Sequence, residues 1–117
     1  MTTITFTKSS TDSYKTDSYK RVECSGHAGF ADSGEDIVCA AISVLTINLI
    51  NSLEKFTEDV FNLDQNEDDG YISISFEHDP SKDADLLLRS FELGVNSIFQ
   101  EYGKKFLNIK FRRDKSC

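Results

Sequence analysis

Short segments in which apolar and polar residues alternate occur along most of the chain, and this period is typical of half-buried β-strands. Ile4 and Phe6 alternate with threonines near the start, and Val22 and Cys24 alternate with polar residues further on. Three more segments with strand character are centred on residues 60–63, 71–77 and 107–111. The pattern therefore predicts five strands.

Two longer segments carry apolar residues at helical spacing. The first predicts a helix that begins at Ser33 or Asp36, either of which can cap it, and that ends near Lys55. No charged residue lies between Asp36 and Glu54, and a second apolar face adds to the first. This second face contains Ile37, Val44, Ile47 and Ile50. A helix that is apolar on nearly all sides is buried on several, so we expect the sheet on one side and a second subunit on another.

The second helix is predicted to begin at Asp79 and Pro80, as N-cap and first helical residue, and to end before Gly103. The element order is then ββαββαβ. This order predicts an α+β fold in which two helices pack on one mixed or antiparallel sheet, with residues 1–117 forming a single domain.

A tandem pentapeptide, TDSYK at residues 11–15 and again at 16–20, separates the first two strands. Because five is odd, two copies in one regular strand would point equivalent side chains to opposite faces. We therefore expect the first copy in a hairpin loop and the second copy leading into the strand at residues 20–25. No function is assigned to the repeat.

The composition and charge of the chain restrict the classes of molecule that it is expected to bind. Of the 117 residues, 38% are hydrophobic, which is enough for a core, and the formal charge is −7. Such acidity disfavours nucleic acid or anionic lipid as a direct partner and weakly favours a basic protein. The nearly uncharged stretch at residues 37–53 contains polar residues and is too short for a confident transmembrane helix. We expect no direct nucleic acid and no membrane partner.

The three cysteines, Cys24, Cys39 and Cys117, form no metal-ligand spacing and no disulfide framework. We expect no signal peptide, because the first six residues contain no basic region and no apolar run. These features favour a reducing cytoplasm with free thiols, and they predict neither a metal nor another cofactor. Cys24 is expected in the core, and Cys117 at an exposed terminus.

The stretch SGHAGFADSGEDIVCAAIS, residues 25–43, carries the clearest candidate chemistry. The nucleophilic form of a cysteine is the deprotonated thiolate. A helix N-terminus or a nearby histidine favours this form, because either one lowers the pKa of the thiol. If Asp36 caps the helix, Cys39 lies in the first turn. If Ser33 caps it, Cys39 lies about a turn deeper and His27 must contribute more. Backbone N–H groups near Cys39 are candidate oxyanion donors.

Asp36 and Ser43 share a helix face with Cys39, three residues before it and four after it. Asp36 could orient His27, or it could simply cap the helix. Ser43 could bind substrate, or its hydroxyl could bond within the helix. Cys39 and His27 also have plain structural interpretations, as a small buried hydrophobe and as a turn residue.

The two motifs Gly26-His27-Ala28-Gly29 and Asp36-Ile37-Val38-Cys39-Ala40-Ala41-Ile42-Ser43 closely resemble the bacterial ribosomal-processing cysteine protease family (Prp). The resemblance implies that Cys39 is the nucleophile and His27 the general acid/base. It gives Asp36, Ser43, Gly26 and Gly29 supporting or substrate-binding positions. It also implies a homodimer, and a substrate that is the N-terminal extension of a large-subunit ribosomal protein (bL27 type).

Two alternatives stay open from the sequence. One is a non-catalytic ribosome-associated or protein-binding module, in which Cys39 and His27 serve structure alone. The other is a redox sensor in which Cys39 is reversibly oxidised, which lacks a resolving cysteine that the sequence can name.

Overall fold

The protein is described here from a computed structural model, which covers residues 1–9, 18–26, 33–66, 70–102 and 105–114. Seven elements follow the predicted order ββαββαβ, which is confirmed. They are β1 (Thr2–Ser9), β2 (Ser18–Ser25), α1 (Ser33–Phe56), β3 (Asn62–Asn66), β4 (Tyr71–Ser75), α2 (Lys82–Tyr102) and β5 (Leu107–Asp114).

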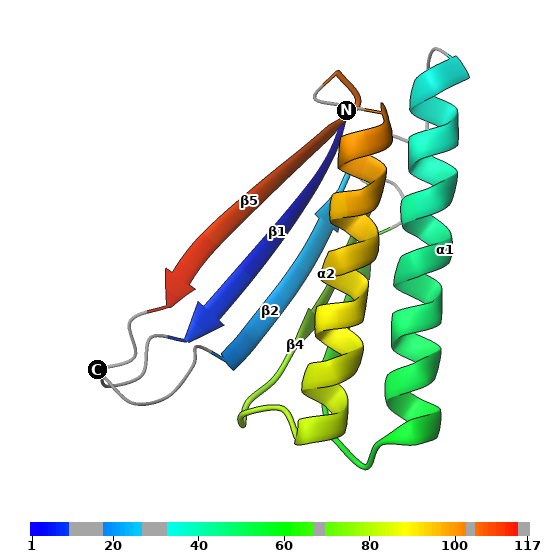
Figure 1. Cartoon of the computed structure of the whole chain (residues 1–117). Coiled ribbons are helices and arrows are strands. Elements are labelled where there is room, and N and C mark those ends of the chain that lie inside the picture. Colours follow the sequence, from blue (N-terminus) through cyan, green and yellow to red (C-terminus); the bar gives the residue numbers. More distant parts are fainter. Residues whose placement is uncertain (10–17, 27–32, 67–69, 103–104, 115–117) are drawn as a thin grey trace.

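The strands form one sheet in the order β3-β4-β2-β1-β5. β1 runs parallel to β5, and every other neighbouring pair is antiparallel, so the sheet is mixed. Both helices lie on the same face of this sheet (Figure 1). Register places Phe6 opposite Val22 on one side and opposite Phe111 on the other. The alternation read from the sequence therefore places one apolar row from each of these strands beneath the helices.

The core lies between the helices and the covered face of the sheet. Ile4 and Phe6 are fully buried, and Cys24 is 7% exposed, which confirms its expected core position. The Phe6 ring stacks on Phe111, with centroids 5.6 Å apart, and meets Phe91 edge-on at 6.0 Å. The helices contribute Val38, Leu53, Leu88 and Val95, all of them fully buried.

Helix α1 contains a 20-residue apolar segment, Ile37–Phe56, that is long enough to cross a membrane by length and composition. It is longer than the stretch expected from the sequence because the helix continues past Glu54. In this fold, Val38 and Leu53 of that segment are fully buried in the core. Of the apolar window, 39% is buried inside the domain, and one such helix is by itself weak evidence of a membrane span.

The start of α2 differs from the prediction. The helix begins at Lys82 rather than at Asp79, and the Ser81 hydroxyl accepts the N–H of Ala84 at 3.2 Å. Ser81 is itself held by Asp59, whose carboxylate accepts the Ser81 N–H at 2.8 Å and the Ser81 hydroxyl proton. A contact across 22 residues thus decides which residue caps this helix.

Strand boundaries also shift. β3 begins at Asn62, two residues after the predicted start, because Val60 lies outside the sheet with 86% of its surface exposed. Asn66 also belongs to β3, so this strand extends three residues past the segment at 60–63 expected from the sequence. β1 extends to Ser9, and β2 begins at Ser18, within the second TDSYK copy. The second copy therefore leads into a strand as expected, whereas the first copy lies outside the described residues.

Candidate active site

A cavity of about 210 Å³ opens beside Cys39. It lies where α1 meets the end of β2 and the β3–β4 hairpin, and most of its lining is apolar. Ile42 of α1, Cys24 of β2 and Ile72 of β4 contribute to that apolar lining, and Gln65 of β3 contributes a polar group. A half-exposed thiol beside an apolar hollow can be reached by a ligand side chain and by solvent.

Cys39 is the seventh residue of α1, which begins at Ser33. The interpretation in which Asp36 caps the helix is therefore wrong, and the alternative that places Cys39 about a turn deeper is correct. The dipole of a helix acts mainly within its first turn. The N–H of Cys39 also lies beyond the first four, so it bonds within the helix rather than serving as an oxyanion donor.

Ser43 lines the same cavity, one turn beyond Cys39. Its hydroxyl donates to the Cys39 carbonyl at 2.8 Å, which is the bond within the helix that the simpler interpretation predicts. Its oxygen keeps a lone pair for a second partner. Asp36 lies in the first turn of α1, and its side chain lies outside the described part of the structure.

Gly26 lies at the cavity, directly before His27 in the chain. Its N–H donates to the Gly70 carbonyl at 3.2 Å, so the end of β2 is tied to the β3–β4 hairpin. His27 and Gly29 fall outside the described residues. The structure therefore brings three of the predicted site residues, Cys39, Ser43 and Gly26, to one cavity.

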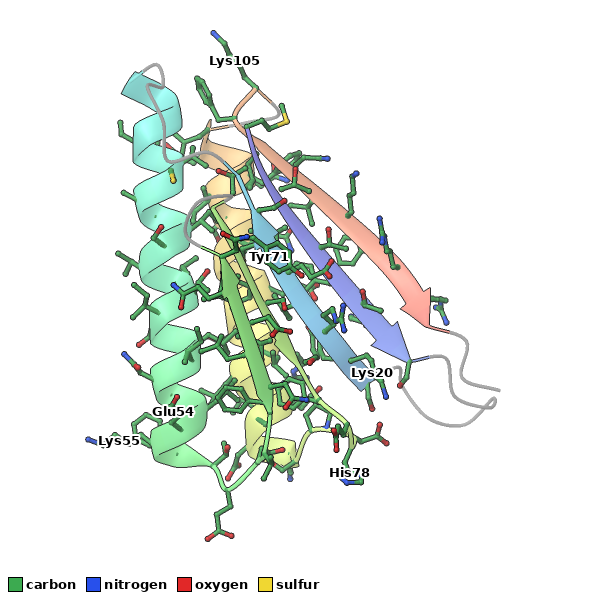
Figure 2. The ribbon with its side chains drawn as sticks, turned by 180° about the vertical axis from the view of Figure 1, so that it is seen from behind. Lys20, Glu54, Lys55, Tyr71, His78 and Lys105 are labelled. Atoms are coloured by element: carbon green, nitrogen blue, oxygen red, sulfur yellow. The ribbon has the colours of Figure 1, made fainter. Side chains whose placement is uncertain are left out.

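The second histidine of the sequence, His78, lies at the opposite end of the molecule from the start of α1 (Figure 2). β4 begins at Tyr71, which lines the cavity, and runs away from it to Ser75, three residues before His78. Five strand residues span about 13 Å from first to last. Since the chain has only two histidines, a histidine partner for Cys39 within the same chain can come only from position 27.

Sequence reasoning missed the cavity residues that come from distant segments. Gly70, Tyr71 and Gln65 all line it, yet none belongs to the motif around Cys39. Gly70 follows a run of acidic residues, a pattern typical of a turn, but such a pattern does not show which residues lie beside the turn. Their position depends on pairing between strands.

Cys24 faces Thr46, with the Cys24 Sγ 3.6 Å from the Thr46 Oγ1. Burial raises the pKa of the Cys24 thiol to about 11, while the contact with Thr46 lowers it to a smaller extent. The Cys24 thiol is therefore neutral and inert near pH 7. Within the described ranges, no group of three or more His, Cys, Asp or Glu side chains is placed to hold a metal ion.

Comparisons with known proteins point to one family. Residues 1–107 match the model of a family described as Cysteine protease Prp. The ribosomal processing cysteine protease Prp of Bacillus subtilis is 31% identical over 84 residues, which are 68% of this chain and 75% of that protein. The protein of the same name from Staphylococcus aureus is 27% identical over 86 residues, which are 73% of this chain and 81% of that protein.

Solved structures share the fold. The crystal structure of a protein from Streptococcus mutans has a TM-score of 0.82 at 30% identity, covering 97% of this chain and 96% of that one. The Staphylococcus aureus protease Prp, crystallised with a substrate peptide, has a TM-score of 0.80 at 23% identity, covering 97% and 100%. The mixed sheet with two helices on one face is therefore shared over nearly the whole chain.

Proposed function

This chain belongs to the cysteine protease Prp family, and we propose that it is a cysteine endopeptidase that removes the N-terminal extension of a large-subunit ribosomal protein of the bL27 type. The observation that carries the proposal is the half-exposed Cys39 at the mouth of an apolar cavity. Two relatives are named for ribosomal processing.

In the proposed reaction the Cys39 thiolate attacks the scissile carbonyl carbon and forms a carbon–sulfur bond. His27, having taken the thiol proton, gives it to the leaving nitrogen as the carbon–nitrogen bond breaks. Water then attacks the thioester, releases the carboxylate and restores the thiol. Thiol and imidazole supply the nucleophile and the proton transfer, so the reaction needs neither a metal nor a cofactor.

Three features support this assignment of roles. His78 lies far from the cavity, so it leaves position 27 as the source of a histidine. Cys24 is buried and neutral, so it does not compete as nucleophile. Because Cys39 lies beyond the first turn of α1, its activation depends more on a proton acceptor than on the helix dipole.

The cavity and the charge both support a peptide substrate. An apolar hollow of about 210 Å³ suits an apolar side chain of an extended segment next to the scissile bond. The net charge of −7 favours approach of a basic ribosomal protein. We include a cytoplasmic location in the proposal, because a catalytic thiol must stay reduced.

Intact-mass spectrometry of the extended ribosomal protein incubated with the enzyme tests this function. We expect one shortened product whose mass difference equals an N-terminal segment. An unchanged mass after prolonged incubation, with the enzyme shown to be folded, would contradict the protease assignment for this substrate. The same ribosomal protein without its extension is the control and is expected to keep its mass.

We also propose that the enzyme is a homodimer that pairs through α1. Ile37, Val44 and Ile47 form a stripe along the helix that is 50%, 67% and 57% exposed. Their spacing of seven and three residues places them on one side, away from the buried Val38. Ile47 also lines the cavity, so a second copy on this stripe would lie beside the site.

Val44→Glu is expected to convert the dimer to a monomer, because a charge would replace an apolar contact at the centre of the stripe. Sedimentation velocity at micromolar concentration measures the change. Leu93→Glu is the matched control, since Leu93 is 68% exposed on α2 and lies off the stripe. A wild-type monomer, or a dimer that survives Val44→Glu, would remove α1 as the interface.

The redox alternative finds no support in the described cysteines. Cys24 faces Thr46, which is seven residues, or about 10 Å of helix, beyond Cys39. Both described cysteines are free thiols in the structure, and the Cys24 thiol contacts Thr46 rather than Cys39. A protein-binding module remains the alternative, and it predicts that replacement of Cys39 changes nothing.

A further inference from the structure

We propose that the uncovered face of the sheet binds the sugar-phosphate backbone of RNA, and that Arg21, Thr7 and Arg112 hold a phosphate group there. This face lies opposite the two helices (Figure 1). The proposed protease reaction does not use it, because Cys39 belongs to α1 on the other face. The inference therefore goes beyond the protease function and does not depend on it.

The uncovered face is polar across its whole width. Because Ile4 and Phe6 are buried beneath the helices, the residues that alternate with them point to the opposite face. Strand register aligns these residues in three rows, each of which crosses all five strands. From β3 to β5 the rows are Asn62, Ser75, Arg21, Thr7 and Arg112; Asp64, Ser73, Glu23, Thr5 and Lys110; and Asn66, Tyr71, Ser25, Thr3 and Asn108. No aliphatic side chain occurs in these rows.

Positive charge is concentrated at the first row. Its only charged residues are Arg21 and Arg112, which are exposed and lie on either side of Thr7. A hollow of about 610 Å³ opens at this row, and Lys20 and Arg113 also contribute to its lining. Four cations and two acids thus line the hollow, whereas the whole chain has 13 cations and 20 acids. The fold therefore gathers cations that the composition does not single out.

The two acids at the hollow are Glu23 and Glu77. Glu23 is partly neutralised, because its carboxylate accepts Arg21 Nη1 at 3.3 Å and the Tyr71 hydroxyl at 3.2 Å. A guanidinium has five N–H donors, so Arg21 keeps donors for a ligand. Within the described ranges no acidic side chain forms an ion pair with Arg112. Glu77 is exposed beyond the end of β4. The first row therefore keeps a positive charge.

The spacing of the first row suits a phosphate group. Arg21 and Arg112 lie two strands apart, which places their Cα atoms about 10 Å from each other. Both side chains are long enough to bring their guanidinium groups above Thr7, which lies between them. Guanidinium groups bind phosphate oxygens through paired N–H donors, and hydroxyl groups donate to the remaining oxygens. Ser75, on the other side of Arg21, supplies a second hydroxyl along the same row.

The side chains on this face favour RNA over a protein partner. Protein interfaces depend on apolar or aromatic anchors at their centre. The rows offer one ring, that of Tyr71, and its hydroxyl is already bonded to Glu23. Arginine, lysine, serine, threonine and asparagine are the side chains that contact nucleic-acid backbones. The 2′-hydroxyl of RNA adds a donor and an acceptor that serine, threonine and asparagine can bind.

The absence of a stacking ring in the first row predicts binding that does not depend on base sequence. The net charge of −7 disfavours nucleic acid for the surface as a whole. This face is a local exception, so we expect weak affinity and a strong dependence on salt. For about three phosphate contacts on a single strand, the logarithm of the association constant should fall with the logarithm of salt concentration with a slope of about −2.

Fluorescence anisotropy of a labelled single-stranded RNA of mixed sequence, titrated with the full chain at about 50 and about 200 mM salt, tests the proposal. Arg112→Gln is expected to weaken binding by about tenfold at the lower salt, because one charged hydrogen-bond donor group is lost. The salt slope should become shallower by about 0.7. The variant should fold, since Arg112 is exposed.

Arg89→Gln is the matched control, because it makes the same change in net charge on the helix side of the molecule. Arg89 lies on α2, where its Nε is 3.6 Å from the Asp85 carboxylate. Its affinity for RNA is expected to stay within about twofold of wild type. Equal losses in Arg89→Gln and Arg112→Gln would show that net charge alone sets the affinity, and would overturn the proposal.

Nuclear magnetic resonance locates the contact. On addition of RNA we expect the backbone amide signals of Thr7 and Ser75 to shift, and that of Val44 on α1 to stay in place. Figure 2 looks onto the face concerned, with Lys20 near one end and Tyr71 toward the other. Shifts confined to the helices would overturn the proposal.

Arg21→Gln is the second variant and carries the test if Arg112→Gln does not fold by circular dichroism. Wild-type protein that binds no RNA at about 50 mM salt would overturn the proposal. An acidic peptide or a single-stranded DNA that binds as tightly as the RNA would overturn the assignment to RNA. These measurements need no turnover, so they decide the RNA site even if the chain cleaves no ribosomal precursor.

Discussion

Cys39→Ala is expected to lower kcat/KM for the ribosomal precursor by at least about 10⁴-fold, because removal of a covalent nucleophile leaves only substrate binding and proton transfer. The fold should persist, since Cys39 is half-exposed at the cavity and not among the residues that make up the core. Intact-mass spectrometry of the precursor measures the loss, and circular dichroism establishes that the variant is folded.

Cys24→Ala is the matched control for this loss. Cys24 is buried in the core beside Thr46, so its replacement is expected to cost on the order of 1 kcal/mol in the free energy of unfolding. Its activity should stay within a few-fold of wild type, because burial raises the pKa of its thiol to about 11. A Cys39→Ala protein that still processes the precursor would refute the mechanism and favour the protein-binding module.

His27→Ala is expected to lower kcat/KM by about 10² to 10⁴-fold, the range typical of a lost general acid/base. Without the histidine, Cys39 should also react more slowly with iodoacetamide at neutral pH, because no nearby base takes up the thiol proton.

His78→Ala separates this effect from a general loss of a histidine. His78 is exposed at the far end of the molecule, so both its kcat/KM and its alkylation rate are expected to match wild type. Peptide mapping after alkylation identifies which cysteine has reacted. If His27→Ala keeps the wild-type alkylation rate, His27 does not activate the thiol, and its role would be limited to protonation of the leaving group.

Much of the fold could be predicted because hydrophobic period is a local property. Alternation around Ile4 and Phe6 requires a strand with one buried face, and the spacing of apolar residues through α2 requires a helix with one buried stripe. The first and last residues of each helix and strand were harder to predict from the sequence. Ser81 caps α2 because Asp59 holds it, and nothing in the local sequence distinguishes it from Asp79.

The residues of the candidate site were likewise predictable only in part. Cys39 could be singled out because its helix start and the preceding histidine are close in sequence, and the family motif covers both. Its depth in α1 depended on where the helix begins, and only the structure placed that start at Ser33. Gly70 and Gln65 could not be found, because the contacts that bring them to the cavity join segments far apart in the chain.

The sequence by itself determined the order of strands and helices, the nucleophile candidate and the family, since each depends on residue type and local spacing. The tertiary structure decided the mixed sheet order, the cavity beside Cys39, the remoteness of His78 and the hydrogen bond that ties Gly26 to Gly70. The physical reason is that pairing between strands and packing between elements join residues that no local pattern connects.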